Sequence, residues 1–142
     1  SEGPGSYTGL RIGMSLAKGL ASPFGLPIIP VPTLESINQG ISIKGKYSIV
    51  LYSHKNIVYS QCYNSGKPIS EIQCEEFKIN NYSKVVGFNL NKICDSKLYV
   101  PCEPSAKYIG KLAILNYQDW AQTDLSIIVP NYVTNFNLGN KI

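Results

Sequence analysis

The sequence predicts an α/β fold with a mixed sheet. Three observations support this class: a helical pattern near the start of the chain, two β-rich runs joined by a short turn, and a second helical pattern near the end. Helical patterns that alternate with short strand-like runs are typical of helices packed on a sheet. At 142 residues, the chain can form one domain or two small lobes.

The first predicted element is a helix over residues 8–21. Its apolar face is marked by residues at helical spacing, namely Leu10, Met14, Ala17 and Ala21. A glycine- and proline-containing loop precedes this helix. We expect its residues Gly3, Pro4, Gly5 and Ser6 to form a tight turn, with Ser6 or Thr8 as the N-cap. Residues 26–32, LPIIPVP, follow as a short strand bounded by prolines. A short helix then begins with Thr33 as N-cap and ends at Gly40.

Strands dominate the middle of the sequence. Residues 47–53 and 57–63 are β-rich runs separated by His54, Lys55 and Asn56, which predicts a hairpin in which Asn56 takes a positive φ. Three further short strands are predicted, over residues 72–79, 84–90 and 97–101. A helix over 103–117 follows, with Pro104 at its first helical position, and residues 125–136 form an extended tail.

The glycines of the opening stretch allow two interpretations. A glycine loop before a helix can bind phosphate through backbone N–H groups, but the spacing here matches neither nucleotide fingerprint, and Pro4 removes one donor. Alternatively, small residues every four positions leave one helix face open to a partner helix; they are Gly9, Gly13, Ala17 and Ala21. Because a helical glycine costs about 1 kcal/mol relative to alanine, we expect a packing gain to offset Gly13, either against a partner helix or by burial of this helix within its own domain.

Composition restricts the chemistry. Thirteen basic and nine acidic residues give a net charge of +4, and the lysines are scattered, which favours a solvated surface over a nucleic-acid footprint. The four cysteines form no CxxC pair and the chain has one histidine, so neither a zinc site nor a cofactor is expected. Reduced thiols in a cytoplasmic protein are expected, and no apolar run is long enough to span a membrane.

Residues 3–37 closely resemble the signature of the bacterial TsaB (YeaZ) family. That signature is a GPGS-aromatic-TG-hydrophobic-RIG segment, a small-residue helix ending in KGLA, a strand, and a Ser/Thr-Leu-Glu helix start. Weaker similarities follow in order: IVLYSHKNIVYSQCY, KVVGFNL, EPSAKYIGKLA and VPNYVTNF. The hairpin departs from the family pattern, because Tyr52, Ser53, His54 and Ile57 replace an Asp-Ala-Arg stretch and a Glu.

The resemblance implies an actin/Hsp70-like (ASKHA) fold of two lobes. Residues 1–44 would be a helix–strand–helix remnant of the N-terminal lobe, and 45–142 the C-terminal lobe with a returning tail. Family members begin with a hairpin, a third strand and a helix ahead of the GPGS loop. The resemblance therefore implies an incomplete N-terminal lobe and a truncated, cleaved or partial chain.

The function that the resemblance implies is that of a non-catalytic scaffold or activator. It would pair with a TsaD-like catalytic paralogue, joined by a TsaE-like ATPase, to make threonylcarbamoyladenosine next to the anticodon of tRNA. Contact with tRNA would be indirect, and the chain alone would form a homodimer. The family pairs through N-terminal-lobe helices, so the candidate interface residues are Gly9, Leu10, Gly13, Met14, Ala17 and Ala21.

Two alternatives remain open. One is a glycoprotease-like (M22-type) hydrolase, but a metal reaction needs more than one histidine, and Ser6 could find a base only in His54. The other is a self-associating module that forms a homodimer through the same helix. Direct tRNA contact stays open as a secondary alternative, since the sequence shows no surface that combines aromatic and basic residues.

Overall fold

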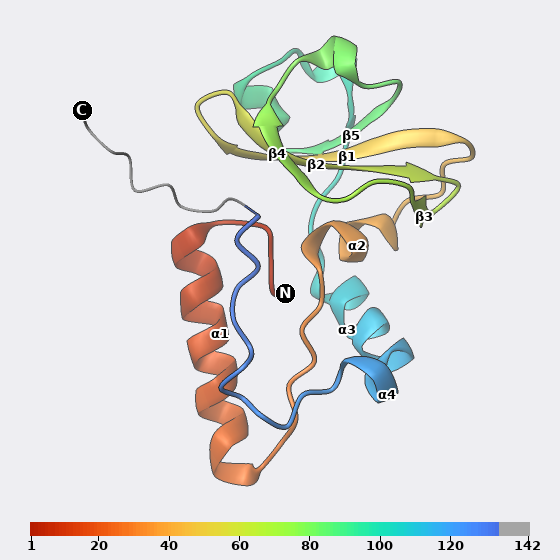
Figure 1. The fold of residues 1–142 in the computed structure, drawn as a ribbon. Helices are drawn as coiled ribbons and strands as arrows, with labels where there is room; N and C mark the ends of the chain where they lie inside the picture. The colour runs from red at the N-terminus through yellow and green to blue at the C-terminus, as the bar shows by residue number, and fades with distance from the viewer. Residues whose placement is uncertain (134–142) are drawn as a thin grey trace, which may run out of the picture.

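The computed structural model describes residues 1–133 as a sheet with helices and extended segments beneath it (Figure 1). The sheet forms the upper layer in that view. Below it, helix α1 (Tyr7–Ala21) lies on one side, and α3 (Ala106–Leu115) with α4 (Tyr117–Trp120) lies on the other. Helix α2 (Thr33–Asn38) sits directly under the sheet, and the segment after α4 returns along α1.

The sheet is mixed and six-stranded. Its strands are β1 (Lys46–His54), β2 (Ile57–Asn64), β3 (Lys67–Pro68), β4 (Gln73–Glu76), β5 (Val85–Phe88) and β6 (Val100–Pro101). The order is β3-β2-β1-β5-β6, with β4 also paired to β2. The β1–β2 and β2–β4 pairs are antiparallel, and β1–β5 and β5–β6 are parallel. Proline in the two shortest strands, β3 and β6, limits further pairing at the edges.

Both faces of the sheet are buried. On the lower face, alternate residues of β1 pack against α2, and this cluster contains Leu34, Ile37, Tyr47, Ile49, Leu51, Tyr63 and Val86. On the upper face, Val50 and Val58 pack with Phe77, Val85 and Leu90. The segments that carry the short 3-10 helices η2 (Ile79–Asn81), η3 (Leu90–Lys92) and η4 (Ser96–Leu98) cover that face. Burial on both sides explains why residues 49–52 in the middle of β1 are consecutive apolar or aromatic residues.

A buried hydrogen-bond chain ties α2 to the sheet. The Tyr47 hydroxyl donates to Asn38 Oδ1 at 2.6 Å, and Asn38 Nδ2 donates to the Gly66 carbonyl at 2.7 Å. Tyr47 is 1% exposed and Asn38 is buried, so water cannot replace the partners of the Tyr47–Asn38 bond, whereas Gly66 is exposed. The orientation of α2 is therefore fixed by polar as well as apolar contacts.

Most of the predicted elements are confirmed. The first helix begins one residue earlier than predicted, at Tyr7, with Ser6 as its N-cap, and ends at Ala21. The β1–β2 hairpin forms as predicted, and strands β4, β5 and β6 lie within the three further runs. The predicted tail is only partly extended: residues 125–127 form a turn and a bend, residues 128–132 belong to no helix or strand, and the predicted last residues, 134–136, lie outside the described part of the chain.

Four local predictions are wrong. Residues 26–32 make only isolated bridges, because three prolines remove backbone donors from any ladder. Pro32, not Thr33, is the N-cap of α2, and the Thr33 backbone N–H donates to the Gly3 carbonyl. At the hairpin turn, Lys55 takes the positive φ of 52° in place of Asn56. The late helix begins at Ala106, because the Ser105 hydroxyl caps it through the Lys107 N–H.

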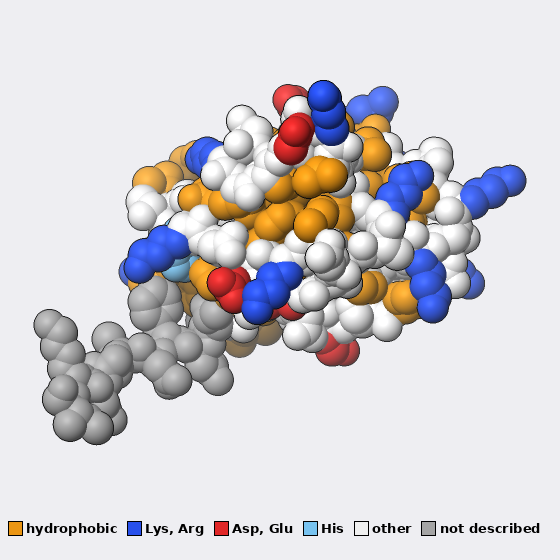
Figure 2. All heavy atoms as spheres, turned by 90° about the horizontal axis from the view of Figure 1, so that it is seen from above, with side chains coloured by type: hydrophobic (Ala, Val, Ile, Leu, Met, Phe, Trp, Pro, Cys, Tyr) orange, Lys and Arg blue, Asp and Glu red, His pale blue; other side chains and the backbone are white. Residues whose placement is uncertain are grey.

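Lysine side chains are scattered over the outer surface, and one of them, Lys78, forms an exposed ion pair with Glu76. Figure 2 shows lysine side chains spaced around an apolar centre on the upper face of the sheet. Within residues 1–133, no helix is both long and apolar enough to cross a bilayer.

Candidate functional site

The opening loop is a packed turn between two other segments. Gly3 has a φ of +119° and is buried, and a Cβ at this position would lie 2.8 Å from the Asn131 carbonyl oxygen. The Glu2 N–H donates to the Val31 carbonyl, and the Asn131 N–H donates to the Glu2 carbonyl. Pro4 is fully buried. Glycine is therefore required at residue 3 for both its backbone angle and the close approach of residue 131.

Ser6 connects this loop to α1. Its Oγ accepts a hydrogen bond from the Gly9 N–H at 3.3 Å, which satisfies one of the free donors in the first turn. Thr8, the alternative N-cap, lies inside the helix. The turn and the cap together set the direction in which α1 leaves the loop.

Helix α1 has an inner and an outer apolar face. On the inner face, Ala21 is buried, and Leu10, Met14 and Ala17 are half-buried. The outer face carries Ile12, Leu16 and Leu20, which are 64%, 62% and 64% exposed. Gly9 and Gly13 are also exposed, and a Cβ at Gly13 would meet no atom within 4 Å. At 100° per residue, these two glycines share the side of the helix that holds Leu16 and Leu20.

The six predicted interface residues are thus divided between the two faces. Gly9 and Gly13 are open to solvent, whereas Leu10, Met14, Ala17 and Ala21 lie toward the body of the protein. The predicted interface did not include the exposed residues Ile12, Leu16 and Leu20, because spacing alone does not tell which of two apolar faces is covered. A helix with apolar residues on more than one side is the signal that could have found them.

A cluster of one cation and two tyrosines joins α1 to the returning tail. Arg11 Nε donates to the Tyr132 hydroxyl at 2.9 Å, and the guanidinium carbon lies 4.1 Å from the centre of the Tyr7 ring. The two tyrosine rings have their centres 5.2 Å apart. The hydrogen bond to Tyr132 is the main cause that raises the pKa of Arg11, so the guanidinium remains charged.

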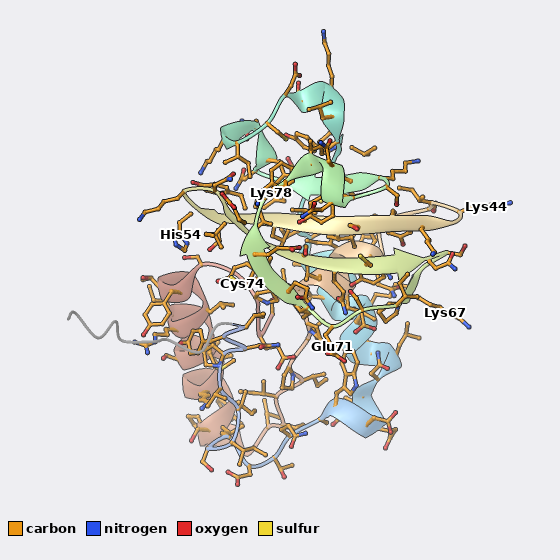
Figure 3. The ribbon with its side chains drawn as sticks, turned by 45° about the horizontal axis from the view of Figure 1, so that its top comes forward. Lys44, His54, Lys67, Glu71, Cys74 and Lys78 are labelled. Carbon is orange, nitrogen blue, oxygen red and sulfur yellow. The ribbon has the colours of Figure 1, made fainter. Side chains whose placement is uncertain are left out.

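A cleft of about 710 Å³ separates the N-terminal end of α1 from the sheet. The loop and first turn of α1 form one wall, including Ser6, Tyr7 and Thr8. The other wall comes from β1, β2 and the turn after β5, including Tyr52, His54, Tyr59, Phe88, Asn89 and Lys92. His54 marks the end of the β1–β2 hairpin that faces α1, whereas Lys44 and Lys67 lie at the far end of the sheet (Figure 3).

Three of the four divergent hairpin residues line the cleft. Tyr52, Ser53 and His54 all belong to its lining, and Ser53 Oγ lies 3.0 Å from His54 Nδ1. Ser6 lines the same cleft, but its Oγ serves as the cap of α1 and its contact is to the Gly9 N–H. Ser6 and His54 therefore line one cleft, but the hydrogen bonds of their side chains go to other residues, Gly9 and Ser53.

The thiols and carboxylates form no metal-binding group in residues 1–133. No set of three or more His, Cys, Asp or Glu side chains there is placed to share an ion. All four cysteines are free and half-buried. Burial raises the pKa of Cys74, Cys94 and Cys102, the last to about 11, so these thiols are held protonated at neutral pH.

Curated proteins with similar sequences share one description. The chain is 41% identical over 64 residues to the tRNA threonylcarbamoyladenosine biosynthesis protein TsaB of Bacillus subtilis (strain 168), a match that covers 44% of this chain and 28% of that protein. It is 55% identical over 39 residues to TsaB of Escherichia coli (strain K12), covering 28% of this chain and 17% of that protein. The matched part is therefore less than a third of the length of either relative.

A family model described as "TsaD: tRNA N6-adenosine threonylcarbamoyltransferase" matches residues 1–89, more than half of the chain. The chain belongs to this family. Its curated relatives identify the TsaB (YeaZ) group within the family, as the GPGS resemblance predicted. The residues that carry this membership include the opening loop, α1, α2 and the β1–β2 hairpin.

Solved structures confirm the mixed α/β fold that TsaB relatives have. An uncharacterized protein with similarity to peptidase YeaZ from Pseudomonas aeruginosa matches with a TM-score of 0.71 at 17% identity, covering 94% of this chain and 71% of that chain. YeaZ from Pseudomonas aeruginosa matches with a TM-score of 0.66 at 18% identity, covering 93% of this chain and 70% of that chain. At such low identity, the likeness is one of fold.

Proposed function

We propose that the chain is a non-catalytic subunit that pairs with a TsaD-like catalytic partner in the threonylcarbamoyladenosine modification of tRNA. The observation that carries this proposal is the outer face of α1. Ile12, Leu16 and Leu20 are each more than 60% exposed, and they form one stripe along the helix. Large apolar side chains gathered on one exposed helix face are typical of a protein–protein contact.

Glycine gives this face the shape that a partner helix needs. Gly9 and Gly13 are exposed beside Leu16 and Leu20, and nothing within 4 Å would meet a Cβ at Gly13. A second helix can therefore approach the α1 backbone closely at Gly13 while its side chains pack between the flanking leucines. The packing gained in the complex would offset the cost of about 1 kcal/mol that a helical glycine brings.

The descriptions of the curated relatives support tRNA modification as the process in which the chain acts. Both are described as tRNA threonylcarbamoyladenosine biosynthesis proteins, and the matching family model names the transferase of the same modification. Within this proposal, residues 1–44 belong to the N-terminal lobe of an actin/Hsp70-like fold and residues 45–142 to its C-terminal lobe. A TsaE-like ATPase would join the pair, and the chain alone would form a homodimer through α1.

The side chains of the cleft support a non-catalytic role. The sequence has one histidine, and in the described chain its ring nitrogen contacts Ser53. The Ser6 hydroxyl caps α1, so it has a structural task at the position where a nucleophile would be sought. The TsaD-like partner would therefore carry the transfer reaction, and this chain would position or activate that partner.

The interface is tested by Gly13→Leu with Gly110→Leu as a matched control. Both glycines lie inside a helix, and a Cβ at either would meet no atom within 4 Å, so each variant gains helix propensity without a clash. The chain is co-expressed with a TsaD-like protein of the same organism, and the complex is measured by size-exclusion chromatography with light scattering. We expect Gly13→Leu to abolish pairing and Gly110→Leu to retain it.

Two results would contradict this assignment. Complex mass that is unchanged in Gly13→Leu would place the contact elsewhere. A wild-type chain that forms only homodimers, even with excess TsaD-like protein, would favour the self-associating module, whose isologous contact could use the same apolar stripe.

A further inference from the structure

The cleft between α1 and the sheet combines aromatic rings with positive charge. Its lining includes the rings of Tyr7, Tyr52, Tyr59, Phe88 and Tyr132 together with Lys92 and His54. Among the described residues that line it, none is Asp or Glu. A cleft with this lining favours a ligand that carries negative charge and flat, stackable groups.

One cation–aromatic pair lies in the cleft lining, and a second lies at its edge, where the rings line the cleft and the cation packs behind them. On the sheet side, Lys92 Nζ lies 4.9 Å from the centre of the Tyr52 ring. On the helix side, Arg11 packs on Tyr7 at 4.1 Å and hydrogen-bonds to the Tyr132 hydroxyl. Tyr7 and Tyr132 are 41% and 37% exposed, so part of each ring faces solvent. The cleft therefore offers two places where a base could stack close to a cation.

We propose that this cleft binds a single-stranded segment of RNA, with bases stacked on tyrosine rings and a phosphate held by Lys92, while Arg11, which packs on Tyr7 outside the lining, adds positive charge beside the cleft. The choice of RNA rests on the proposed function, whose substrate is a tRNA with a single-stranded anticodon loop. Two cation–aromatic pairs on opposite sides of the cleft suit successive nucleotides of a strand better than one free nucleotide. Stacking contributes roughly 1–3 kcal/mol per base and tolerates any sequence.

This proposal replaces the expectation that tRNA contact is only indirect. The sequence shows no aromatic–basic surface, because its members come together only in the fold. Arg11 and Tyr132 are 121 residues apart in the chain. Tyr52 lies in β1 and Lys92 in η3, so no local pattern reveals their pairing.

Fluorescence anisotropy tests the proposal with the full 142-residue chain and a 12-nucleotide, fluorescein-labelled single-stranded RNA. Two variants change the cleft: Lys92→Gln removes a cation, and Tyr132→Leu removes a ring. Two matched controls lie outside its lining: Lys111→Gln on α3 and Tyr117→Leu on α4, both exposed. Thermal unfolding of each variant verifies that all of them fold.

We expect the wild-type chain to bind with an affinity that falls as salt rises. Lys92→Gln should weaken binding about 3- to 10-fold and lower the slope of log K against log salt by about 0.7. Tyr132→Leu should weaken it at least about fivefold. The two controls should stay within about twofold of the wild type.

The proposal is overturned if the wild-type chain does not bind, or if the controls lose as much affinity as the cleft variants. It is also overturned if AMP, double-stranded RNA or an acidic peptide competes as well as the single strand does. The same variants are then mixed with the TsaD-like protein. If the chain pairs normally with the TsaD-like protein but does not bind RNA, only the proposal of RNA binding in the cleft is rejected. If it binds RNA but does not pair with that protein, the proposed subunit role is rejected.

Discussion

The hydrogen-bond chain from Tyr47 through Asn38 to Gly66 gives the sharpest stability prediction. Tyr47→Phe keeps the ring, which stacks on Tyr63 with centres 5.7 Å apart, and removes only the hydroxyl. That hydroxyl donates to Asn38 Oδ1 at 2.6 Å in a region closed to water. The change therefore leaves a buried carbonyl oxygen of α2 without the donor that it has in the wild type.

The expected cost follows from this burial. Leaving a buried acceptor without its partner costs about 1–3 kcal/mol, because the oxygen has lost its hydration and gains no replacement. For a chain of this size, such a loss lowers Tm by roughly 3–12 °C. Tyr117→Phe is the control: Tyr117 is 46% exposed, so its change should stay within about 0.5 kcal/mol.

Thermal unfolding followed by circular dichroism measures both variants. A double-mutant cycle with Asn38→Ala then isolates the pair, and we expect an interaction energy of at least about 0.5 kcal/mol. If Tyr47→Phe is as stable as Tyr117→Phe, or if the two changes are additive in the cycle, the hydrogen bond does not secure α2 to the sheet. In that case the apolar cluster alone would hold this helix.

Two further predictions concern buried sites around β5. Gly87→Ala should lower the free energy of unfolding in urea by about 1–3 kcal/mol, because the new Cβ would overlap Leu90 Cδ1 and lie 3.1 Å from Tyr99 Cδ2. If the variant is as stable as the wild type, the Leu90 side chain moves aside without cost. Burial and, secondarily, the Glu103 charge raise the pKa of Cys102 to about 11, so its thiolate fraction at pH 8 is about a hundredfold below that of an ordinary thiol. Iodoacetamide should label Cys102 slowly at pH 8 and faster as pH rises toward 11, and labelling at the rate of free cysteine at pH 8 would contradict this burial.

The periodic spacing of apolar residues predicted the helices and strands that depend on contacts between residues close together in the sequence. The β1–β2 hairpin and α1 were predictable, since alternation and helical spacing act within a few residues. The prediction failed for residues 26–32, where the apolar character suggested a strand but the prolines left isolated bridges. It failed again at the hairpin turn, where Lys55 adopts the positive φ and the Asn56 side chain instead donates to the Phe77 carbonyl.

The candidate site was predictable only in part. The loop before α1 and its Ser6 cap follow from the sequence, because a cap acts within one helical turn. The sequence could not tell which side of α1 is open, since the inner face is covered by a segment more than one hundred residues away. The cleft was also invisible, because Tyr52, Lys92 and Tyr132 meet only after the sheet and the tail are in place.

If the chain assists a catalytic partner and does not itself modify tRNA, as proposed, the modification depends on both proteins being present. The most direct measurement is the amount of threonylcarbamoyladenosine formed on tRNA in a reaction reconstituted with the TsaD-like protein and the TsaE-like ATPase, with and without this chain. We expect modification when wild-type chain or Gly110→Leu is added, and little with Gly13→Leu or without the chain. Equal modification in its absence, or modification by the chain alone, would contradict the proposal.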